Sequence, residues 1–298
     1  MRVKKNPLEW TFDIFNLLLM LFVVAITLSP FLHIAAISFN EARDASAGGI
    51  GIWPRVWSID SYITVFRHNA IFDAFLVSVA RTIVGTILAL TMTSIVAFTM
   101  TKRHLIGYKY IYRFFIVSMF VSGGLIPTFF LYQWIGIINT FWVYVLPGMF
   151  SVFHMIIMRT FMLGLPIEME ESALLDGASE LLVFARIIIP LSKPILATIG
   201  LFVAVGQWNA WTDTLFFTTD PRLETLQFVL VRVMNQAEAT QIVREVRGAG
   251  TMDMRAISIT PQSVRMAITM VSVVPILFVY PFLQKYFVKG MLIGAVKG

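Results

Sequence analysis

Long uncharged stretches dominate the pattern of hydrophobic and polar positions along this chain. The stretches without Asp, Glu, Lys or Arg are 14–40, 82–101, 114–158, 194–212 and 266–284. A transmembrane helix needs about 20 mainly apolar residues. As a single helix, 114–158 would be about 68 Å long at 1.5 Å per residue. That is roughly twice the hydrocarbon core of about 30 Å, so this stretch must fold back on itself.

Turn-forming residues show where the long stretch reverses. Gly136, Asn139 and Thr140 separate two apolar runs, and residues of these types mark turns. Gly123-Gly124 before Pro127 indicates a second irregularity, either a hinge or a close helix contact through small residues. The pattern therefore predicts six transmembrane helices, at about 14–38, 73–101, 111–134, 141–162, 194–217 and 264–285.

The composition excludes a soluble enzyme. The chain is 58% hydrophobic and 13% charged, with a mean hydropathy of +0.80, whereas soluble domains are about 45–50% apolar and about 25% charged. It has no cysteine, which excludes disulfides and thiolate metal sites. The four histidines lack ligand spacing, and no G-x-x-x-x-G-K-[ST] motif is present. We expect no metal, no cofactor and no catalytic residue in this chain.

The net charge of +6 reflects membrane orientation rather than nucleic-acid binding. With a cytoplasmic N-terminus, the cytoplasmic segments hold 13 of the 23 Lys and Arg residues, as the positive-inside rule requires. Both termini are then cytoplasmic. The segments 39–72 and 218–263 lie outside the cell, and the tail 286–298 lies inside. The prediction is one all-α integral membrane domain over 1–298.

The cytoplasmic segment 163–193 carries the clearest functional signal. Pro166 opens a helix with an acidic first turn, Asp176-Gly177 breaks it, and Pro190 and Pro194 end a second helix. Apolar residues at three- and four-residue steps give one apolar stripe along Leu174, Ala178, Leu181, Ala185 and Ile188, which the Asp176-Gly177 break divides between the two helices. A helix lying on the membrane surface usually has a basic polar face. This one is acidic, which favours docking onto another protein.

The same segment resembles the EAA loop of permeases from binding-protein-dependent ABC importers. That pattern is Glu-Ala-Ala, three residues, Gly, nine residues, then Ile-x-Leu-Pro, and it begins here at Glu171. Ser172 replaces the first Ala and Ile189 replaces the Leu. The resemblance implies a six-helix type I permease whose loop docks in a cleft of a separate ATPase subunit. The residues implied to couple to the ATPase are Glu170, Glu171, Ala173, Asp176, Gly177 and Ala178.

Gly123-Gly124-Leu125-Ile126-Pro127, Leu146-Pro147-Gly148 and Trp208-Asn209-Ala210-Trp211-Thr212-Asp213 resemble the MalG-like sugar branch of this family, and the resemblance extends over nearly the whole chain. The tail from Lys285 to Gly298 resembles the LplB/YtcP-like oligosaccharide and polysaccharide sub-branch. The resemblance implies oligosaccharide or polysaccharide import across the bacterial inner membrane, including acidic polymers of the alginate type. It implies a second, different permease, an ATPase dimer that binds ATP and Mg, and an extracytoplasmic solute-binding protein. In such chains the tail reaches the ATPase, which here assigns Lys289, Gly290, Gly294 and Lys297. A loop before the last helix probes the binding protein, which assigns Arg247, Gly248 and Gly250.

Charges within predicted spans suggest a solute path. Arg81 lies inside the second span and Asp213 near the outer end of the fifth, and charges in a membrane usually face a cavity or a partner. The two could instead pair with each other or with the partner permease. Trp208, Asn209 and Trp211 belong to the same candidate path, where the indoles could stack on sugar rings. An interfacial aromatic belt explains such residues equally well.

Two other classes of protein remain open on the sequence. An ion-coupled secondary transporter should carry intramembrane acids and inverted repeats, and neither a repeat nor acids beyond Asp213 are evident. A membrane enzyme or scaffold should show a polar catalytic cluster near an interface, and none is evident.

Overall fold

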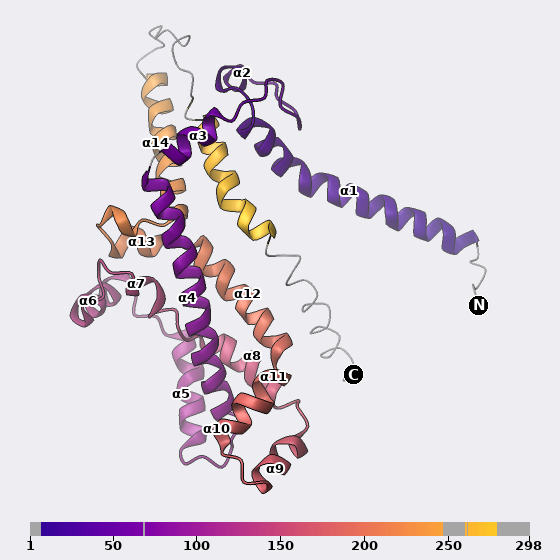
Figure 1. The fold of residues 1–298 in the computed structure, drawn as a ribbon, viewed down its shortest axis with the longest axis vertical. Helices are drawn as coiled ribbons and strands as arrows, with labels where there is room; N and C mark the ends of the chain where they lie inside the picture. The colour runs from indigo at the N-terminus through magenta and orange to yellow at the C-terminus, as the bar shows by residue number, and fades with distance from the viewer. Residues whose placement is uncertain (1–6, 68, 247–259, 261, 279–298) are drawn as a thin grey trace. The chain divides into compact units, whose positions relative to one another are not determined.

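A computed structural model describes residues 7–67, 69–246, 260 and 262–278, and within these residues the regular elements are helical (Figure 1). The α-helices are α1 (Pro7–Ser38), α2 (Ala42–Ser46), α3 (Asp60–Arg67), α4 (Asn69–Thr99), α5 (Tyr108–Phe120), α6 (Leu125–Ile135), α7 (Trp142–Val145), α8 (Val152–Met162), α9 (Ile167–Leu175), α10 (Glu180–Val183), α11 (Ile189–Leu191), α12 (Lys193–Asn209), α13 (Thr212–Phe217) and α14 (Leu226–Val246). A π-helical turn covers Phe184–Ile188, a 3₁₀ turn covers Pro221–Leu223, and a further helix covers Gln262–Phe278. The all-helical prediction is confirmed.

The described residues form two compact units. The first contains α1, α2, α3, the end of α14 and most of the helix Gln262–Phe278. The second runs from Ala70 to Val231 and contains α4 to α13. The predicted ATPase hairpin and the predicted solute path both lie in the second unit.

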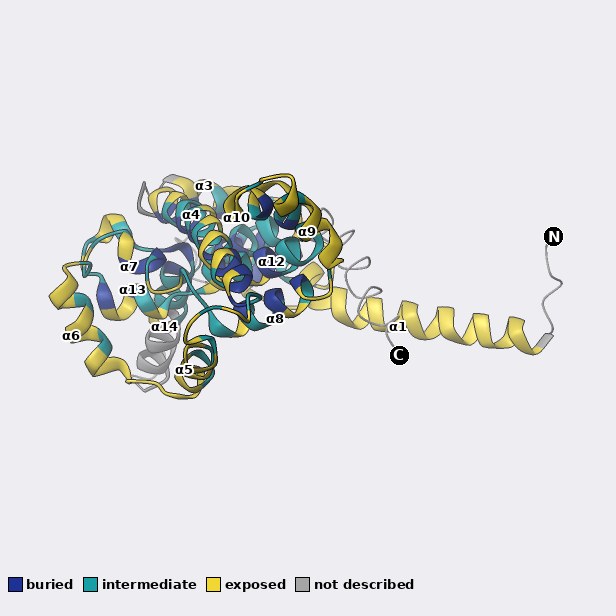
Figure 2. Cartoon of the chain, turned by 90° about the horizontal axis from the view of Figure 1, so that it is seen from below, coloured by how far each residue is buried: buried dark blue, intermediate teal, exposed yellow. Residues whose placement is uncertain are grey.

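Helices long and apolar enough to cross a membrane are Leu8–Ser38 and Ile71–Thr99. Three bent helix pairs raise the possible spans to five if each pair counts as one. The helix Gln262–Phe278 is apolar but shorter. The count of six spans stays a prediction. α1 exposes its apolar side chains over most of its length (Figure 2), as suits a helix facing lipid or another subunit.

Several predicted spans are interrupted. The segment 111–134 is two helices, α5 and α6, which meet at 119° across Val121–Gly124. Gly124 has φ +79°, and a Cβ there would meet no atom within 4 Å. Gly124 is therefore required by the backbone of the break, not by close packing within the chain. The single helix predicted for 194–217 is likewise broken, at Ala210 between α12 and α13.

The predicted reversal at Gly136 and Asn139 is confirmed. Gly136 ends α6 with φ +80°, and Asn139 has φ +58°, a conformation that Asn tolerates better than most residues. The Asn139 side-chain oxygen accepts hydrogen bonds from the backbone N–H groups of Thr219 and Asp220, each at 2.9 Å. The turn after α6 is thereby joined to the end of α13.

The buried core of the second unit lies between α4, α8 and α12. Phe98 of α4, Met155 and Met158 of α8 and Ile199 of α12 belong to one buried cluster. A Cβ on Gly200 would lie 3.2 Å from Leu90, so α12 and α4 approach closely there. The adaptable thioethers of methionine fill this interface.

In the first unit, buried Asn40 organises the loop after α1. Its amide oxygen accepts the N–H groups of Arg55 and Val56, and its nitrogen donates to Asp44 at 2.8 Å. Arg55 also binds Asp44 at 3.0 Å. The hydrogen bond from Asn40, reinforced by Arg55, lowers the pKa of Asp44. This part of the predicted external segment 39–72 is therefore an ordered loop. Before the last described helix, the Thr260 hydroxyl accepts the Ser263 N–H at 3.3 Å, as an N-cap threonine does.

Candidate functional site

The segment between α8 and α12 is a helical hairpin set at a large angle to both. α8 and α9 are bent by 79°, and the helical run Glu180–Leu191 is bent from α12 by 79°. Pro166 is the N-cap of α9, and Glu168 and Glu170 lie in its first turn, where the helix dipole favours carboxylates. The predicted start of this helix is confirmed.

Gly177 makes the bend of the hairpin. Its N–H donates to Leu174 O at 3.0 Å, and the Ala178 N–H donates to Ala173 O at 3.0 Å. These two bonds form a Schellman motif, whose C′ residue takes a left-handed conformation. Gly177 has φ +84°, and a Cβ there would meet nothing within 4 Å. The backbone, and not space within this chain, requires glycine here.

The outer surface of the hairpin is acidic and apolar. Glu171, Asp176 and Gly177 are exposed, whereas Ala173 and Ala178 pack on the buried cluster of the second unit. The predicted apolar stripe is divided at the Asp176-Gly177 break, and its members differ in exposure. Leu181 is 74% exposed, because the Schellman turn interrupts the 3.6-residue period between α9 and α10. Leu175 is 88% exposed beside the bend. The hairpin therefore presents acidic and apolar groups together.

Lys102, just after α4, joins the hairpin to the rest of the unit. Its ammonium forms an ion pair with Glu170 and lies 3.6 Å from Glu180. It also lies 4.6 Å from the centroid of the Phe98 ring, a cation–π contact. Glu170, predicted to face another subunit, thus points into its own chain, and of the predicted acidic residues Glu171 and Asp176 remain exposed.

Arg159 of α8 forms a second connection at the same end of the unit. Its Nε donates to Met100 O at 2.6 Å and its Nη2 to the Tyr108 hydroxyl at 2.6 Å. Its guanidinium stands 4.8 Å over the Tyr112 ring. The bond to Met100 satisfies a carbonyl just after α4, where helices leave such groups unpaired. Arg159 therefore ties α8 to the ends of α4 and α5.

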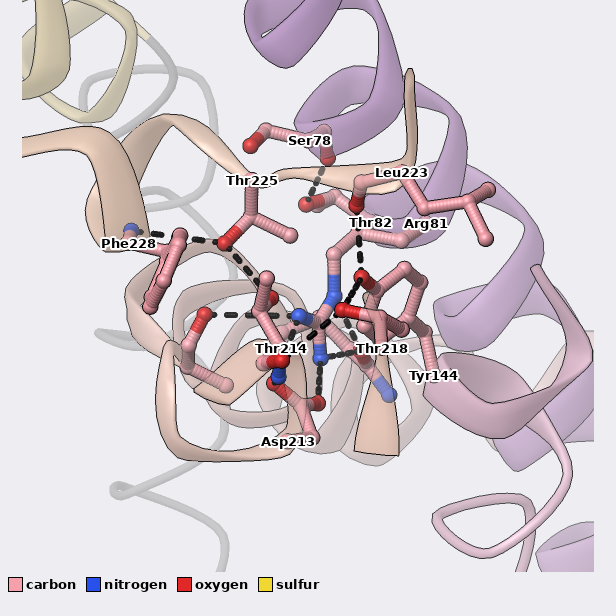
Figure 3. A network of polar contacts seen from close by, with 12 residues as sticks. Ser78, Arg81, Thr82, Tyr144, Asp213, Thr214, Thr218, Leu223, Thr225 and Phe228 are labelled. Atoms are coloured by element: carbon pink, nitrogen blue, oxygen red, sulfur yellow. Dashed lines mark hydrogen bonds and ion pairs between the residues drawn. The ribbon is translucent and has the colours of Figure 1, made fainter. Parts of the chain in front are cut away.

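Arg81 and Asp213, predicted for the solute path, pair with each other (Figure 3). The Arg81 Nη1 and Nη2 lie 3.1 and 2.5 Å from the two Asp213 oxygens. Nε and Nη2 donate to Gln207 Oε1 at 3.1 and 3.0 Å, and Nη1 donates to Ala210 O at 3.3 Å. These bonds use all five N–H groups of a guanidinium. Arg81 has no donor left for a solute.

This ion pair joins α4 to the break between α12 and α13. The Arg81 side chain is 2% exposed and that of Asp213 is 22% exposed. The guanidinium also lies 4.6 Å from the centroid of the Tyr144 ring. Ala210 has no helical conformation, so its carbonyl is available to Arg81. The break in α12–α13 and the charge of Arg81 therefore stabilise each other.

Hydroxyl groups extend the network around the pair. Tyr144 donates to Leu223 O at 2.5 Å, and the hydroxyls of Thr214 and Thr225 are 3.0 Å apart (Figure 3). Ser78 Oγ of α4 accepts the Leu226 N–H at 2.8 Å. These bonds fasten the start of α14 to α4 and satisfy polar groups that would be costly to bury unpaired.

Gln207 sits in a space that two glycines provide. A Cβ on Gly85 would lie 2.9 Å from the Gln207 amide, and one on Gly148 would lie 3.2 Å from Gln207 Nε2. Because guanidinium groups only donate, Oε1 must face Arg81 and Nε2 must face away. Glycine in a helix costs about 1 kcal/mol relative to alanine. At Gly85 that cost is offset by the room it leaves for the amide.

This arrangement gives a test on α4. We expect Gly85→Ala to lower the melting temperature of the purified protein, although alanine is the better helix former, because the new methyl displaces Gln207 from Arg81. Gly206→Ala on α12 is the matched control, since a Cβ there would meet nothing within 4 Å. A Gly85→Ala protein as stable as that control would contradict this interpretation.

A pocket of about 350 Å³ lies beside the pair. Its lining includes Tyr132, Ser151, His154, Phe202, Gly206 and Gln207, together with Arg81 and Asp213. Small-molecule sites typically measure about 300–1,000 Å³ and combine an apolar lining with a few polar groups. This pocket fits that description at the small end.

The remaining predicted path residues lie outside the pocket lining. Trp208 is buried against Phe75, with ring centroids 6.0 Å apart. Asn209 accepts a hydrogen bond from Gln227 at 3.3 Å, and Trp211 is half-buried before α13. The proposed binding-protein loop (Arg247, Gly248, Gly250) and the tail (Lys289, Gly290, Gly294, Lys297) lie outside the described residues.

The sequence interpretation missed Gln207, Tyr144 and the pocket role of His154. A signal for Gln207 was present: it is an amide within an otherwise apolar helix, and a buried arginine needs acceptors. Nothing local to Tyr144 indicates its contact with Arg81, which depends on how α7 packs.

Comparisons with known proteins agree with this architecture. Protein LplC of Bacillus subtilis is 40% identical over 288 residues, covering 96% of this chain and 95% of that protein. The polygalacturonan/rhamnogalacturonan transport system permease protein YtcP of Bacillus subtilis is 33% identical over 285 residues, covering 96% and 97%.

A solved structure shares the fold. It is a crystal structure of a bacterial ABC transporter involved in the import of the acidic polysaccharide alginate, with a TM-score of 0.82, 23% identity and coverage of 96% of this chain and 99% of that one. The family model for binding-protein-dependent transport system inner membrane components matches residues 89–293. This chain belongs to that family of membrane permeases.

Proposed function

We propose that this chain is a permease subunit of an ATP-driven importer that moves oligosaccharides or polysaccharides from a solute-binding protein into the cytoplasm. Its family membership carries the proposal, supported by two relatives of nearly equal length. The described residues contain no group of His, Cys, Asp or Glu suited to a metal. The chain has no phosphate-binding loop, so ATP and Mg belong on partner ATPase subunits.

The exposed hairpin supports the coupling mechanism. Glu171, Asp176 and the Gly177 bend face outward, where a cleft of the ATPase dimer could receive them. The ion pairs of Lys102 connect that hairpin to the end of α4. The bonds of Arg159 connect α8, which leads into the hairpin, to the ends of α4 and α5. When ATP closes the ATPase dimer, movement of the hairpin passes to the transmembrane helices through these contacts.

The remaining subunits and the orientation are part of the same proposal. The permease would lie in the bacterial cytoplasmic membrane with both termini inside and six spans. It would pair with a different permease, with which the exposed apolar faces of α1 and α6 could pack. The segments 247–258 and 289–298 would contact the binding protein and the ATPases.

We propose an acidic oligosaccharide as the solute. YtcP is named for polygalacturonan and rhamnogalacturonan, and the transporter of similar fold for alginate. All these polymers contain uronic acids. Within this chain the donors of Arg81 are used by protein acceptors, so carboxylate recognition would fall to the binding protein and the second permease.

Reconstituted uptake tests the proposal. The complete complex in vesicles should import galacturonate or mannuronate oligosaccharides only with ATP and binding protein, and an uncoupler should leave uptake unchanged. Uptake that survives without ATP and stops with the uncoupler would indicate the alternative, an ion-coupled transporter.

A substitution at Lys102 tests the connection to the hairpin. We expect Lys102→Gln to lower uptake per ATP hydrolysed about two- to fivefold, the equivalent of roughly 0.5–1 kcal/mol for a partly exposed ion pair. Lys102→Arg keeps the charge and should retain most coupling. The measurement is the ratio of sugar transported to phosphate released. Equal ratios in Lys102→Gln and wild type would remove Lys102 from the mechanism.

A further inference from the structure

The pocket beside the Arg81–Asp213 pair contains polar groups that the protein leaves without partners. Among the described residues, Gln207 Nε2, the Tyr132 hydroxyl and the His154 ring form no hydrogen bond with other protein atoms, while Ser151 Oγ only accepts, from the His154 N–H. All four residues line the same pocket. They offer a neutral mixture of donors and acceptors, which is what the hydroxyl groups of a sugar require.

Within the described part of the chain, the pocket lining offers a ligand no unpaired positive charge. Arg81 is the cation in the lining, and its five N–H groups are already used. Asp213 is partly exposed, but its charge is balanced by the paired guanidinium, so the pair neither attracts nor repels a uronate strongly. The phenol of Tyr132, the phenyl groups of Phe202 and Phe217 and the ring of Tyr144 supply apolar surface, against which the C–H face of a pyranose can pack.

We propose that this pocket is a subsite for one pyranose ring and that it recognises ring hydroxyls, with Gln207 as the central donor, and not the carboxylate. This inference rests on the proposed function and specifies what this subunit contributes to it. Its consequence is that neutral and acidic sugars of the same hydroxyl pattern bind here equally well, while selection for charge occurs elsewhere in the importer.

Gly206 offers a position for a chemical probe in the wall of the pocket. It lines the pocket and is exposed, and a Cβ there would meet no atom within 4 Å. The chain has no cysteine, so Gly206→Cys places a single thiol in this subunit at the pocket wall. Val205→Cys on the same helix is the matched control, because Val205 is not part of the lining.

The experiment measures how fast a maleimide labels the introduced thiol in the complete, nucleotide-free complex. The probes are the uronate trisaccharide that the wild type imports and its carboxyl-reduced, neutral counterpart. At about 10 mM sugar, a site with a Kd of about 1 mM is roughly 90% occupied, so labelling should slow about tenfold. Both sugars should protect equally, and labelling of the Val205→Cys control should not change.

Two results would overturn the proposal. One is unchanged labelling of Gly206→Cys with both sugars at a concentration at which the wild-type complex imports the trisaccharide. The other is that the uronate slows labelling of Gly206→Cys and its neutral counterpart does not, which would mean that a cation in the pocket binds the carboxylate. Failure of the proposed function would be seen in a different measurement. Vesicles with the wild-type complex, ATP and binding protein would then import neither the galacturonate nor the mannuronate trisaccharide.

Discussion

Asp213→Ala is expected to destabilise the protein more than Arg81→Met, although both remove the same ion pair. The Arg81 side chain is 2% exposed and the Asp213 side chain is 22% exposed. Removing Asp213 leaves a buried guanidinium without its counter-charge, which costs about 3–5 kcal/mol. Removing Arg81 leaves a carboxylate that water can still reach in part. The check is the melting temperature of the detergent-solubilised complex and its yield from membranes.

The double variant distinguishes a buried charge from a simple loss of contacts. Arg81→Met with Asp213→Ala removes both charges, so it should be more stable than Asp213→Ala alone. The pair of Arg55 and Asp44 provides the control, because its guanidinium is 46% exposed and that of Arg81 is 2% exposed. Asp44→Ala leaves no buried charge unpaired, so it should lower the melting temperature less than Asp213→Ala does. Additive losses in the double variant would show that the pairing of these two charges is not what stabilises the α12–α13 break.

The pairing of Arg81 illustrates how far the sequence could lead. A charge within an apolar span predicts a partner or a cavity, and Asp213 was the available acid. The structure gives Arg81 both, with a carboxylate, an amide and a carbonyl as acceptors and a pocket at its side. Gln207 could have been found by asking which acceptors remain for five donors. The space for its amide depends on Gly85 and Gly148, which only tertiary packing brings together.

Helix breaks inside the membrane were the least predictable part of the fold. The spans are predicted from apolar composition alone. That composition does not distinguish one long helix from two short helices joined by a turn. Gly123-Gly124 was a visible signal for the break between α5 and α6. The break at Ala210 has no glycine or proline of its own. It depends on Arg81, 129 positions earlier, which binds the freed carbonyl.

The backbone of the hairpin, unlike the helix breaks, could be predicted from the local sequence. Its start at Pro166 and its bend at Gly177 follow from capping rules that act over a few residues, and both are observed. The direction of its side chains depends on contacts with distant residues. Glu170 faces inward because Lys102 lies at the end of α4, which no local pattern indicates.

Substitutions at Gly177 should have the largest effect on transport. Gly177→Val places a β-branched residue at φ +84°, where even an unbranched L-residue is disfavoured by about 1–2 kcal/mol. We expect it to distort the bend and abolish uptake and coupled ATP hydrolysis. The complex should still insert in the membrane, because a Cβ at position 177 would meet no other atom of the chain within 4 Å. Uptake, ATP hydrolysis and membrane yield are measured together.

Gly177→Asn separates the two requirements at this position. Asparagine tolerates the left-handed conformation, so the bend should be kept while a side chain is added to the exposed surface. If the ATPase cleft closes tightly on Gly177, the Asn variant loses transport with the hairpin intact, and Glu171→Lys on the neighbouring exposed face does the same. Normal uptake in Gly177→Asn and Glu171→Lys would mean that the hairpin does not dock through this surface, since both changes alter its shape or charge without altering its backbone.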